Sequence, residues 1–246
     1  MIPMDAAARS VPSRSPDSIL VTEIFGPTFQ GEGSSAGERA VFVRLSRCNL
    51  NCIWCDTPET WDSSRFDLRA VSRWMSRQQV WQEISARDAG LVVITGGEPL
   101  LQQVKIAWLA AKCHATDRRV EIETNGTVVP SDDLLGTAAR FNVGVKLANS
   151  SVTAARRVNA VAIRQFVSSG RAVFKFVVAS PAELDEIAGL QRSYELPADR
   201  IWVMPEGTTS QKVLDGLRLL ADPVLERGWN LTPRLHTLLW ENSRGR

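Results

Sequence analysis

Short apolar runs alternate with segments of helical spacing along most of the chain. The runs at 91–95 (LVVIT), 172–178 (AVFKFVV) and 200–204 (RIWVM) carry apolar residues at consecutive positions rather than at every second one. A strand buried on both faces has this composition, which is typical of a parallel sheet covered by helices. Right-handed strand–helix units then predict an α/β fold, either an open doubly wound sheet or a partial barrel.

About six such units fit into the chain, fewer than the eight of a complete (β/α)8 barrel. We expect the parallel strands at 40–46, 91–95, 120–124, 142–147, 172–178 and 200–204, with an extra strand before them at 19–25 and a last strand at 230–240. We expect the helices at 68–88, 102–114, 131–140, 158–168 and 208–221, with a further one that opens at Pro181. Residues 1–16 show no periodicity, so we predict a flexible arm there and a single domain at 17–246.

The charge balance and the hydropathy argue against two classes of partner. The chain has 29 Lys and Arg residues against 27 Asp and Glu, so a formal charge of +2 does not hold it to nucleic acid or to an anionic membrane. No apolar run approaches the ~18–20 residues that span a bilayer. With four cysteines and no apolar core of signal-peptide length at 1–16, we expect a cytoplasmic protein.

Polar and glycine-rich stretches follow the predicted parallel strands. They read RCNLNC, GGEP, NGT, ANSS and PEGTT, each directly after or near the end of a strand. In both candidate architectures, ligands bind at the C-terminal ends of the strands. One edge of the sheet is therefore predicted to carry the chemistry.

Three cysteines, Cys48, Cys52 and Cys55, fall within eight residues after the strand at 40–46. Clustered thiols in a reducing compartment indicate metal or redox chemistry. A structural zinc needs four protein ligands, whereas a [4Fe-4S] cluster held by three cysteines leaves one iron open to an external ligand. The spacing favours the cluster and leaves zinc or a redox-active thiol loop as alternatives. Candidates for a fourth zinc ligand are Cys113, His114 and His236.

The C-x3-C-x2-C pattern, with Trp54 before its last cysteine, resembles the radical S-adenosylmethionine (SAM) superfamily. Gly96-Gly97-Glu98-Pro99, after the next strand, resembles the superfamily motif that receives the methionine amino group of SAM. Glycines allow a close approach of backbone to ligand, and a carboxylate can accept from an ammonium. The resemblance implies that SAM binds the open iron and is split by an electron from the cluster to give a 5′-deoxyadenosyl radical.

Four further segments narrow the resemblance, which extends from about Leu20 to Trp240. They are TFQGEG at 28–33, Arg44, CDT at 55–57 followed by Trp61, and ETNGT at 123–127. Together they resemble the 7-carboxy-7-deazaguanine synthases. The resemblance implies a lyase of 7-deazapurine (queuosine-type) biosynthesis, which converts 6-carboxy-5,6,7,8-tetrahydropterin to 7-carboxy-7-deazaguanine by ring contraction with loss of ammonia. It also implies a shortened barrel, a homodimer, Mg²⁺, SAM as a reusable cofactor and an external electron donor of the flavodoxin or ferredoxin type.

Position by position, the resemblance implies a set of ligand contacts and no catalytic side chain, because the cofactor carries the radical. The pterin substrate is assigned to Phe29, Gln30, Gly31, Arg44 and Thr95. SAM is assigned to Trp54, Asp56, Gly97, Glu98, Glu123, Asn125 and Lys146. The cluster is assigned to Cys48, Cys52 and Cys55, and Mg²⁺ to Thr57. The planar donors of Arg44 suit the substrate carboxylate, while an exposed strand-end arginine is the alternative. Turn chemistry alone is the alternative for Glu123 and Asn125.

The chain departs from the family pattern at the end of the fourth parallel strand. Where the family often shows Ser-Pro-Lys, the chain keeps only Lys146, and Gly144 offers no hydroxyl. Arg234 and His236, expected on the last strand, are candidates for the substrate pocket, with a hydrogen-bonded core histidine as the alternative for His236. Two other functions stay open from the cysteines alone, namely an activating enzyme for a glycyl radical and a non-catalytic metal or electron-transfer module.

Overall fold

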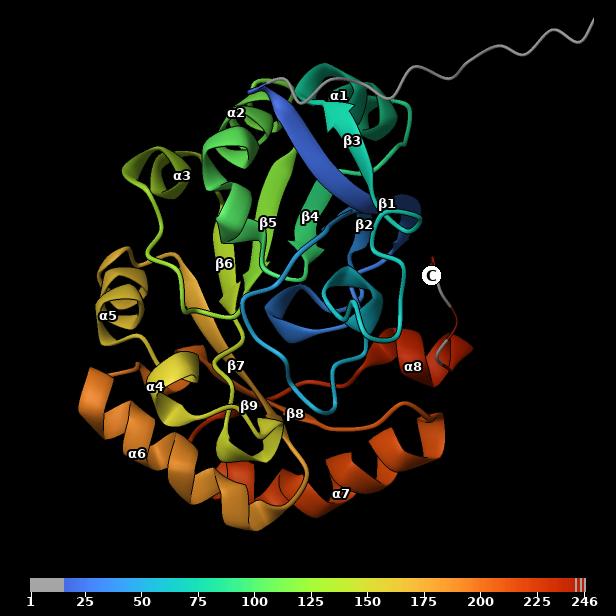
Figure 1. Ribbon diagram of the computed structural model, residues 1–246. Coiled ribbons are helices and arrows are strands. Elements are labelled where there is room, and N and C mark those ends of the chain that lie inside the picture. The colour runs from blue at the N-terminus through green and yellow to red at the C-terminus, as the bar shows by residue number, and fades with distance from the viewer. Residues whose placement is uncertain (1–15, 242, 244, 246) are drawn as a thin grey trace, which may run out of the picture.

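The computed structural model describes residues 16–241, 243 and 245 (Figure 1). The predicted flexible arm therefore lies outside the described residues, apart from its last residue, Pro16. In the described part of the chain, no helix has the length and apolar character needed to cross a membrane.

One nine-stranded sheet forms the centre of the described residues, in the order β3-β1-β2-β4-β5-β6-β7-β8-β9. The pairs β2-β4, β4-β5, β5-β6, β6-β7, β7-β8 and β8-β9 are parallel, whereas β1 is antiparallel to both β2 and β3. This is the α/β partial barrel with an extra N-terminal strand that the sequence predicts. The bounds are β1 (Ser18–Phe29), β2 (Arg39–Leu45), β3 (Arg73–Ser76), β4 (Leu91–Gly96), β5 (Arg119–Thr124), β6 (Arg140–Val143), β7 (Ala172–Val178), β8 (Ile201–Pro205) and β9 (Asn230–Leu231).

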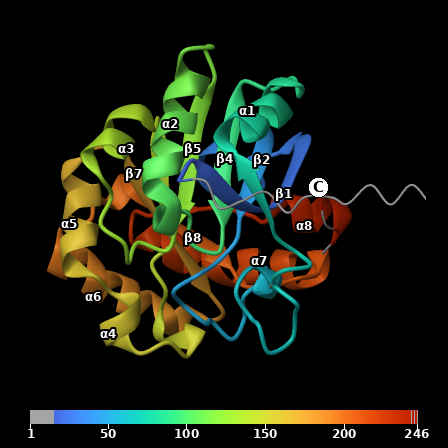
Figure 2. The ribbon, with the colours of Figure 1, turned by 45° about the horizontal axis from the view of Figure 1, so that its top comes forward.

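The helices lie around the outside of the curved sheet, as Figures 1 and 2 show for α2, α3, α5, α6 and α7. Short 3-10 turns lie in several connections, including Pro58–Thr60 and Pro99–Gln102. The helix bounds are α1 (Arg77–Ser85), α2 (Gln103–His114), α3 (Asp132–Thr137), α4 (Ala154–Arg157), α5 (Ala160–Ser168), α6 (Leu184–Tyr194), α7 (Ser210–Glu226) and α8 (Leu235–Trp240).

The two faces of β4 show why its sequence is an uninterrupted apolar run. Val92 and Ile94 belong to the large core between the sheet and the helices. Leu91 and Val93 point to the opposite face, where they pack in a second cluster with Phe42 of β2. Because both faces are buried, successive positions of the strand must be apolar.

The prediction of one helix over 68–88 is wrong in its first half. Residues Arg73–Ser76 form the edge strand β3, in which Met75 pairs with Ile19 and Trp74 with Leu20. The helix begins only at Arg77, because Ser76 caps it with Gln79 in a capping box. Trp74 and Met75 fit a helical pattern as well as a strand, and the pairing with β1 decides between the two.

Two predicted strands are shorter than expected. The strand predicted at 142–147 ends at Val143, and the chain then turns toward a 3-10 turn at Ala148–Ser150. The strand predicted at 230–240 ends at Leu231, and residues Leu235–Trp240 form α8. Pro233 has no N–H to continue a strand ladder, which accounts for the early end of β9. His236 consequently lies on a helix and not on a strand.

Candidate active site

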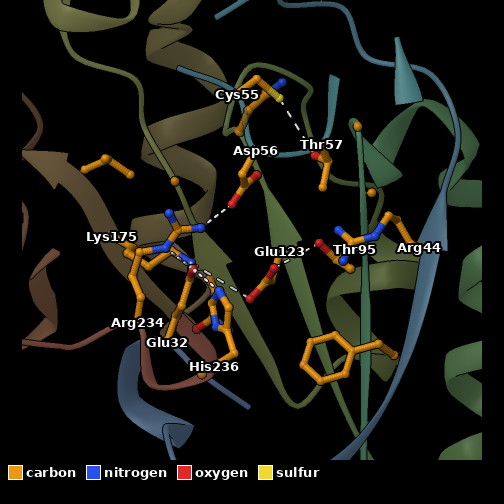
Figure 3. A pocket seen from close by; sticks show the side chains of 18 of the residues that line it. Glu32, Arg44, Cys55, Asp56, Thr57, Thr95, Glu123, Lys175, Arg234 and His236 are labelled. Carbon is orange, nitrogen blue, oxygen red and sulfur yellow. Dashed lines mark hydrogen bonds and ion pairs between the residues drawn. The ribbon is translucent and has the colours of Figure 1, made fainter. Parts of the chain in front are cut away.

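A cavity of about 270 Å³ opens at the C-terminal ends of the parallel strands (Figure 3). Its lining includes Arg44 near the end of β2, Thr95 of β4, Glu123 of β5 and Lys175 of β7. Side chains from four strands meet here because parallel strands end at the same edge of the sheet. The edge of the sheet at which the sequence predicts the chemistry therefore carries a cavity.

The three clustered cysteines all line this cavity, and none forms a disulfide. Cys52 is buried, Cys48 and Cys55 are half-buried, and they pack with Leu50 and Val152 in a small apolar cluster. The loop is anchored from α4, where Arg156 donates to the Asn49 carbonyl at 2.7 Å and to Asn51 Oδ1 at 3.1 Å. Two hydrogen bonds from α4 therefore hold the cysteine loop in place.

The sulfur atoms have donors and a low-polarity environment. Leu50 N–H donates to Cys48 Sγ at 3.4 Å, and Trp61 Nε1 donates to Cys55 Sγ at 3.3 Å. Burial raises the pKa of the Cys48 thiol to about 11, against the opposing effect of the Leu50 N–H, and also raises the pKa of Cys52. Metal binding at these thiols must therefore displace protons.

Within the described residues, no three His, Cys, Asp or Glu side chains gather closely enough to hold one metal ion. The cysteines of an iron–sulfur cluster bind separate irons and stand farther apart than the ligands of one tetrahedral zinc. Of the three candidates for a fourth zinc ligand, Cys113 lies in the main core and His114 is exposed at the end of α2, whereas His236 lines the cavity.

The Gly-Gly-Glu-Pro segment packs directly on the start of the cysteine loop. A side chain on Gly97 would place its Cβ 2.1 Å from the Arg47 carbonyl oxygen, so only glycine fits. Glu98 N–H donates to that same carbonyl at 2.7 Å. The glycine therefore allows the end of β4 to lie against the cysteine loop, and Gly97 lines the cavity as expected for a cofactor contact.

The side chain of Glu98 does not line the cavity, which contradicts the expected contact of its carboxylate with SAM. It is fully buried, and it accepts from Leu100 N–H at 2.9 Å, Thr124 Oγ1 at 2.8 Å and Asn125 N–H at 2.7 Å. With both oxygens engaged by these donors, the carboxylate joins the ends of β4 and β5.

The other residues assigned to SAM lie close to the cysteines. Trp54, Asp56, Asn125 and Lys146 all line the cavity, and Lys146 Nζ lies 5.3 Å from the centre of the Trp54 ring. Asn125 Nδ2 donates to Asn49 Oδ1 at 2.9 Å, beside Cys48. Lys146 thus faces the cavity even though the residues before it differ from the family pattern.

Glu123 lies among the residues assigned to the substrate. Its Oε2 accepts from Thr95 Oγ1 at 2.9 Å, and its Oε1 accepts from Gln30 Nε2 at 3.2 Å. The structure therefore groups Glu123 with Gln30 and Thr95, although the sequence assigns it to the cofactor.

The loop that follows β1 and the helix α8 close another side of the cavity. A Cβ on Gly31 would lie 2.0 Å from His236 Nδ1, and Leu235 N–H donates to the Gly31 carbonyl at 2.8 Å. Phe29, which is half-exposed, stacks on Trp240 with ring centres 6.3 Å apart. The absence of a side chain at residue 31 therefore admits the histidine ring.

Arg44 and Thr57 both line the cavity. Arg44 is largely buried, donates to Glu23 Oε1 at 2.7 Å and stacks over Phe25 at 5.5 Å. This pairing excludes the exposed strand-end alternative for Arg44. Thr57 Oγ1 lies 3.8 Å from Cys55 Sγ.

Two charged residues of the cavity, Glu32 and Lys175, are missing from the sequence-based assignment. Lys175 Nζ bonds the Glu32 carboxylate and lies 3.9 Å from Glu123 Oε1. Burial disfavours the charged forms of both side chains, but their attraction for each other outweighs it. The pKa of Glu32 therefore lies below its ordinary value, with a further contribution from Arg234, and the pKa of Lys175 lies above its ordinary value. A lysine inside the apolar run AVFKFVV is the signal that could have indicated this site.

Comparison with known proteins agrees with this geometry. Residues 43–178 match the family described as the Radical SAM superfamily. The chain is 34% identical over 229 residues to 7-carboxy-7-deazaguanine synthase of Pyrobaculum aerophilum, covering 93% of this chain and 97% of the relative. It is 32% identical over 241 residues to the synthase of Rhodopirellula baltica, covering 94% and 90%. The crystal structure of QueE from Escherichia coli superposes with a TM-score of 0.68 at 25% identity, covering 87% of this chain and 93% of that one.

Proposed function

The chain belongs to the 7-carboxy-7-deazaguanine synthase family of the radical SAM superfamily, and from this premise we propose how its cavity serves that reaction. The protein is an enzyme with a small-molecule substrate, 6-carboxy-5,6,7,8-tetrahydropterin. One observation supports the proposal most strongly: the three-cysteine loop and the Gln30–Thr95–Glu123 group line the same cavity. A cofactor on one side and a pterin on the other would then lie within reach of each other.

Cys48, Cys52 and Cys55 would hold a [4Fe-4S] cluster, with SAM beside it along Gly97, Asn125 and Lys146. When bound, the cluster and SAM supply the radical chemistry that removes a hydrogen atom from the substrate. The protein itself binds and orients the two molecules and keeps water from them. Trp54, with Lys146 over its ring, offers an aromatic surface for the adenine.

The carboxylate of Glu123 suits the hydrogen-bonding edge of a pterin. That edge presents an amino group and a ring N–H, both of them donors, and a carboxylate accepts two donors side by side. Thr95 and Gln30 already orient the carboxylate through bonds of 2.9 and 3.2 Å. We assign these three residues to recognition of the ring, with Phe29 and Gly31 beside them.

Arg44 would receive the carboxylate of the substrate. Its guanidinium now bonds Glu23 through Nε, and its two terminal nitrogens leave further donors for a second carboxylate. Thr57 would hold Mg²⁺ through its hydroxyl, since this ion takes few protein oxygens and completes its shell with substrate and water. The ion would supply positive charge to the substrate.

We extend the proposal to the partners and the location of the enzyme from the family resemblance. It acts as a homodimer in the cytoplasm, within a single domain at 17–246, and takes its electron from an external flavodoxin- or ferredoxin-like donor. The loop that carries the cysteines reaches the surface at Ile53, which is 72% exposed, and this gives such a donor a short route to the cluster.

The test is conversion of the pterin by the purified chain after anaerobic reconstitution with iron and sulfide. With SAM, Mg²⁺ and a reductant, the mass of 7-carboxy-7-deazaguanine and an equal amount of ammonia should appear. The Cys48→Ala variant, which lacks a cluster ligand, is the matched control and should give neither. An iron-loaded protein that leaves the pterin unchanged would contradict the proposal.

A further inference from the structure

Arg234 joins three segments of the chain that meet at the cavity (Figure 3). Only 7% of its surface is exposed. Its Nε donates to Glu32 Oε1 at 3.2 Å, its Nη1 donates to the Gly207 carbonyl at 2.7 Å, and its Nη2 bonds the Asp56 carboxylate. All three nitrogens of the guanidinium are thus engaged, each by a different segment.

The two carboxylates on Arg234 belong to the two halves of the proposed site. Asp56 directly follows the cluster ligand Cys55 and precedes Thr57. Glu32 directly follows Gln30 and Gly31, and its second oxygen bonds Lys175, which lies 3.9 Å from Glu123. A continuous path of ion pairs therefore runs from the cysteine loop through Arg234 to the residues assigned to the pterin.

A guanidinium suits this place better than an ammonium does. Its planar donors point in fixed directions, so two carboxylates and a carbonyl held by it keep a fixed arrangement. The Asp56 side chain is 43% exposed, so this end of the path is open to solvent, whereas the end at Glu32 and Lys175 is largely buried. Arg234 thus anchors an accessible loop to a rigid part of the cavity.

We propose that Arg234 is a positioning residue. It fixes the position of the cysteine loop relative to the loop at 30–32, which carries residues assigned to the pterin. The proposal rests on the proposed function and adds to it a defined link between the two halves of the site. Because the link passes through Asp56, ordering of the cysteine loop by its cluster is transmitted to Glu32 and to the pterin subsite. Without the guanidinium both loops remain, but their positions relative to each other are no longer fixed.

The first test measures binding and needs no turnover. The probe is 6-carboxypterin, the fluorescent oxidised analogue of the substrate, titrated into cluster-free and cluster-loaded protein. Cluster loading should tighten the binding of the probe to the wild type at least about fivefold. In the Arg234→Met and Arg234→Lys variants it should tighten binding less than about twofold, because the coupling between the two sites is lost. An equal effect in wild type and variants, or no effect in the wild type, would overturn the link.

Arg227 provides a matched control. It donates to a carboxylate, Asp185, at 3.0 Å and to the Pro223 carbonyl at 3.0 Å, but it lies outside the cavity. Arg227→Met should keep the wild-type effect of the cluster on pterin binding. If both methionine variants lose the effect in proportion to their folded fraction, Arg234 has a merely structural role and the proposal fails.

The second test uses turnover and separates positioning from folding. A displacement of about 1 Å between reacting groups can cost a hundredfold in rate. In Arg234→Lys we therefore expect unchanged iron content, kcat at least about 100-fold lower, and at least about tenfold more 5′-deoxyadenosine released per product. An unchanged ratio of 5′-deoxyadenosine to product would contradict a positioning role. Wild type that binds the pterin and shows the cluster effect, yet makes no product, would instead contradict the proposed function.

Asp56 offers a variant on the exposed side of the link, where misfolding is a small risk. Asp56→Asn should reproduce the loss of the cluster effect on pterin binding in the wild-type background. In the Arg234→Met background it should add nothing, because residues that act through one partner are not additive. Additive effects of the two substitutions would overturn the proposed path.

Discussion

The Thr95 hydroxyl donates to Glu123 Oε2 at 2.9 Å across two neighbouring parallel strands. In the register of β4 and β5, Ile94 lies opposite Ile122, so Thr95 and Glu123 follow as the next pair at the strand ends. The carboxylate is thereby fixed over the cavity, with Gln30 on its other oxygen. A group held in this way is preorganised for a ligand with adjacent donors.

Glu123→Gln should weaken the binding of the pterin and leave the cluster intact. An amide presents one acceptor in place of two, and hydrogen bonds to a charged group contribute about 1.5–3 kcal/mol, so KM should rise roughly 10- to 100-fold. The measurement is KM for the carboxytetrahydropterin at equal iron content. Glu38→Gln, at an exposed ion pair with Arg119, is the control and should leave KM unchanged. A KM within twofold of wild type for Glu123→Gln would remove this residue from the substrate site.

The cysteines should divide sharply in an iron assay. Cys48→Ala, Cys52→Ala and Cys55→Ala should each reduce bound iron from about four atoms per chain to a small fraction of that. Cys113→Ala should retain the full amount of iron, because Cys113 lies on α2 and is buried in the main hydrophobic core. Burial there raises the pKa of its thiol to about 12. Loss of iron in the Cys113 variant, at unchanged folding, would point to a fourth protein ligand.

Gly31→Ala should destabilise the protein through His236. The added methyl would lie 2.0 Å from Nδ1 of the ring, and overpacking of this kind costs about 1–3 kcal/mol. The free energy of unfolding, measured with urea, should fall by that amount. In the His236→Ala background, Gly31→Ala should lower the free energy of unfolding much less, because the added methyl no longer meets the ring. No recovery would show that the penalty arises elsewhere in the loop.

Stability should fall as the pH drops below about 6.5, and His236 should account for part of the slope. Burial lowers the pKa of His236 below its ordinary 6.5, although Glu32, Asp56 and Glu123 face it and oppose the shift. Between the two pKa values the unfolded chain binds a proton that the folded chain does not, so acid favours unfolding by up to about 1.4 kcal/mol per pH unit.

The measurement is the free energy of unfolding at pH 7.5, 6.5 and 5.5. His236→Gln should flatten the dependence over this range, whereas His114→Gln, at an exposed position at the end of α2, should leave it unchanged. Glu32 contributes only at lower pH, because its pKa is depressed and its stabilisation is lost below its ordinary 4.5. An equal slope in wild type and His236→Gln would show that the ring is not held neutral.

Local patterns predict the sheet and the edge that carries the site. The run at 91–95 forms β4 because both of its faces are buried. The two glycines after it are required because Gly96 approaches Leu45 closely and Gly97 approaches Arg47 closely. The strand predicted for the end of the chain overlooks a local signal, because the apolar residues 235, 238 and 239 have helical spacing. Pro233 is a second local signal against a long strand there.

The ion pairs among the charged residues of the site could not be predicted from the sequence, although a lysine inside the apolar run at 172–178 signals a buried charge. Lys175 meets Glu32 across 143 residues, and Arg234 meets Asp56 across 178. Such pairs depend on which strands are neighbours and on where each loop returns, and no periodicity encodes either. The same holds for Glu123, whose place beside Thr95 and Gln30 follows from the strand register and not from its motif.

The most direct test of the three-cysteine site is the electron paramagnetic resonance spectrum of the reduced, iron-loaded protein with and without SAM. An iron without a protein ligand can bind SAM, so the spectrum of a reduced [4Fe-4S] cluster should appear and should change when SAM is added. A protein that takes up zinc in place of iron, or a cluster whose spectrum is unchanged by SAM, would contradict the assignment of Cys48, Cys52 and Cys55 to an open cluster.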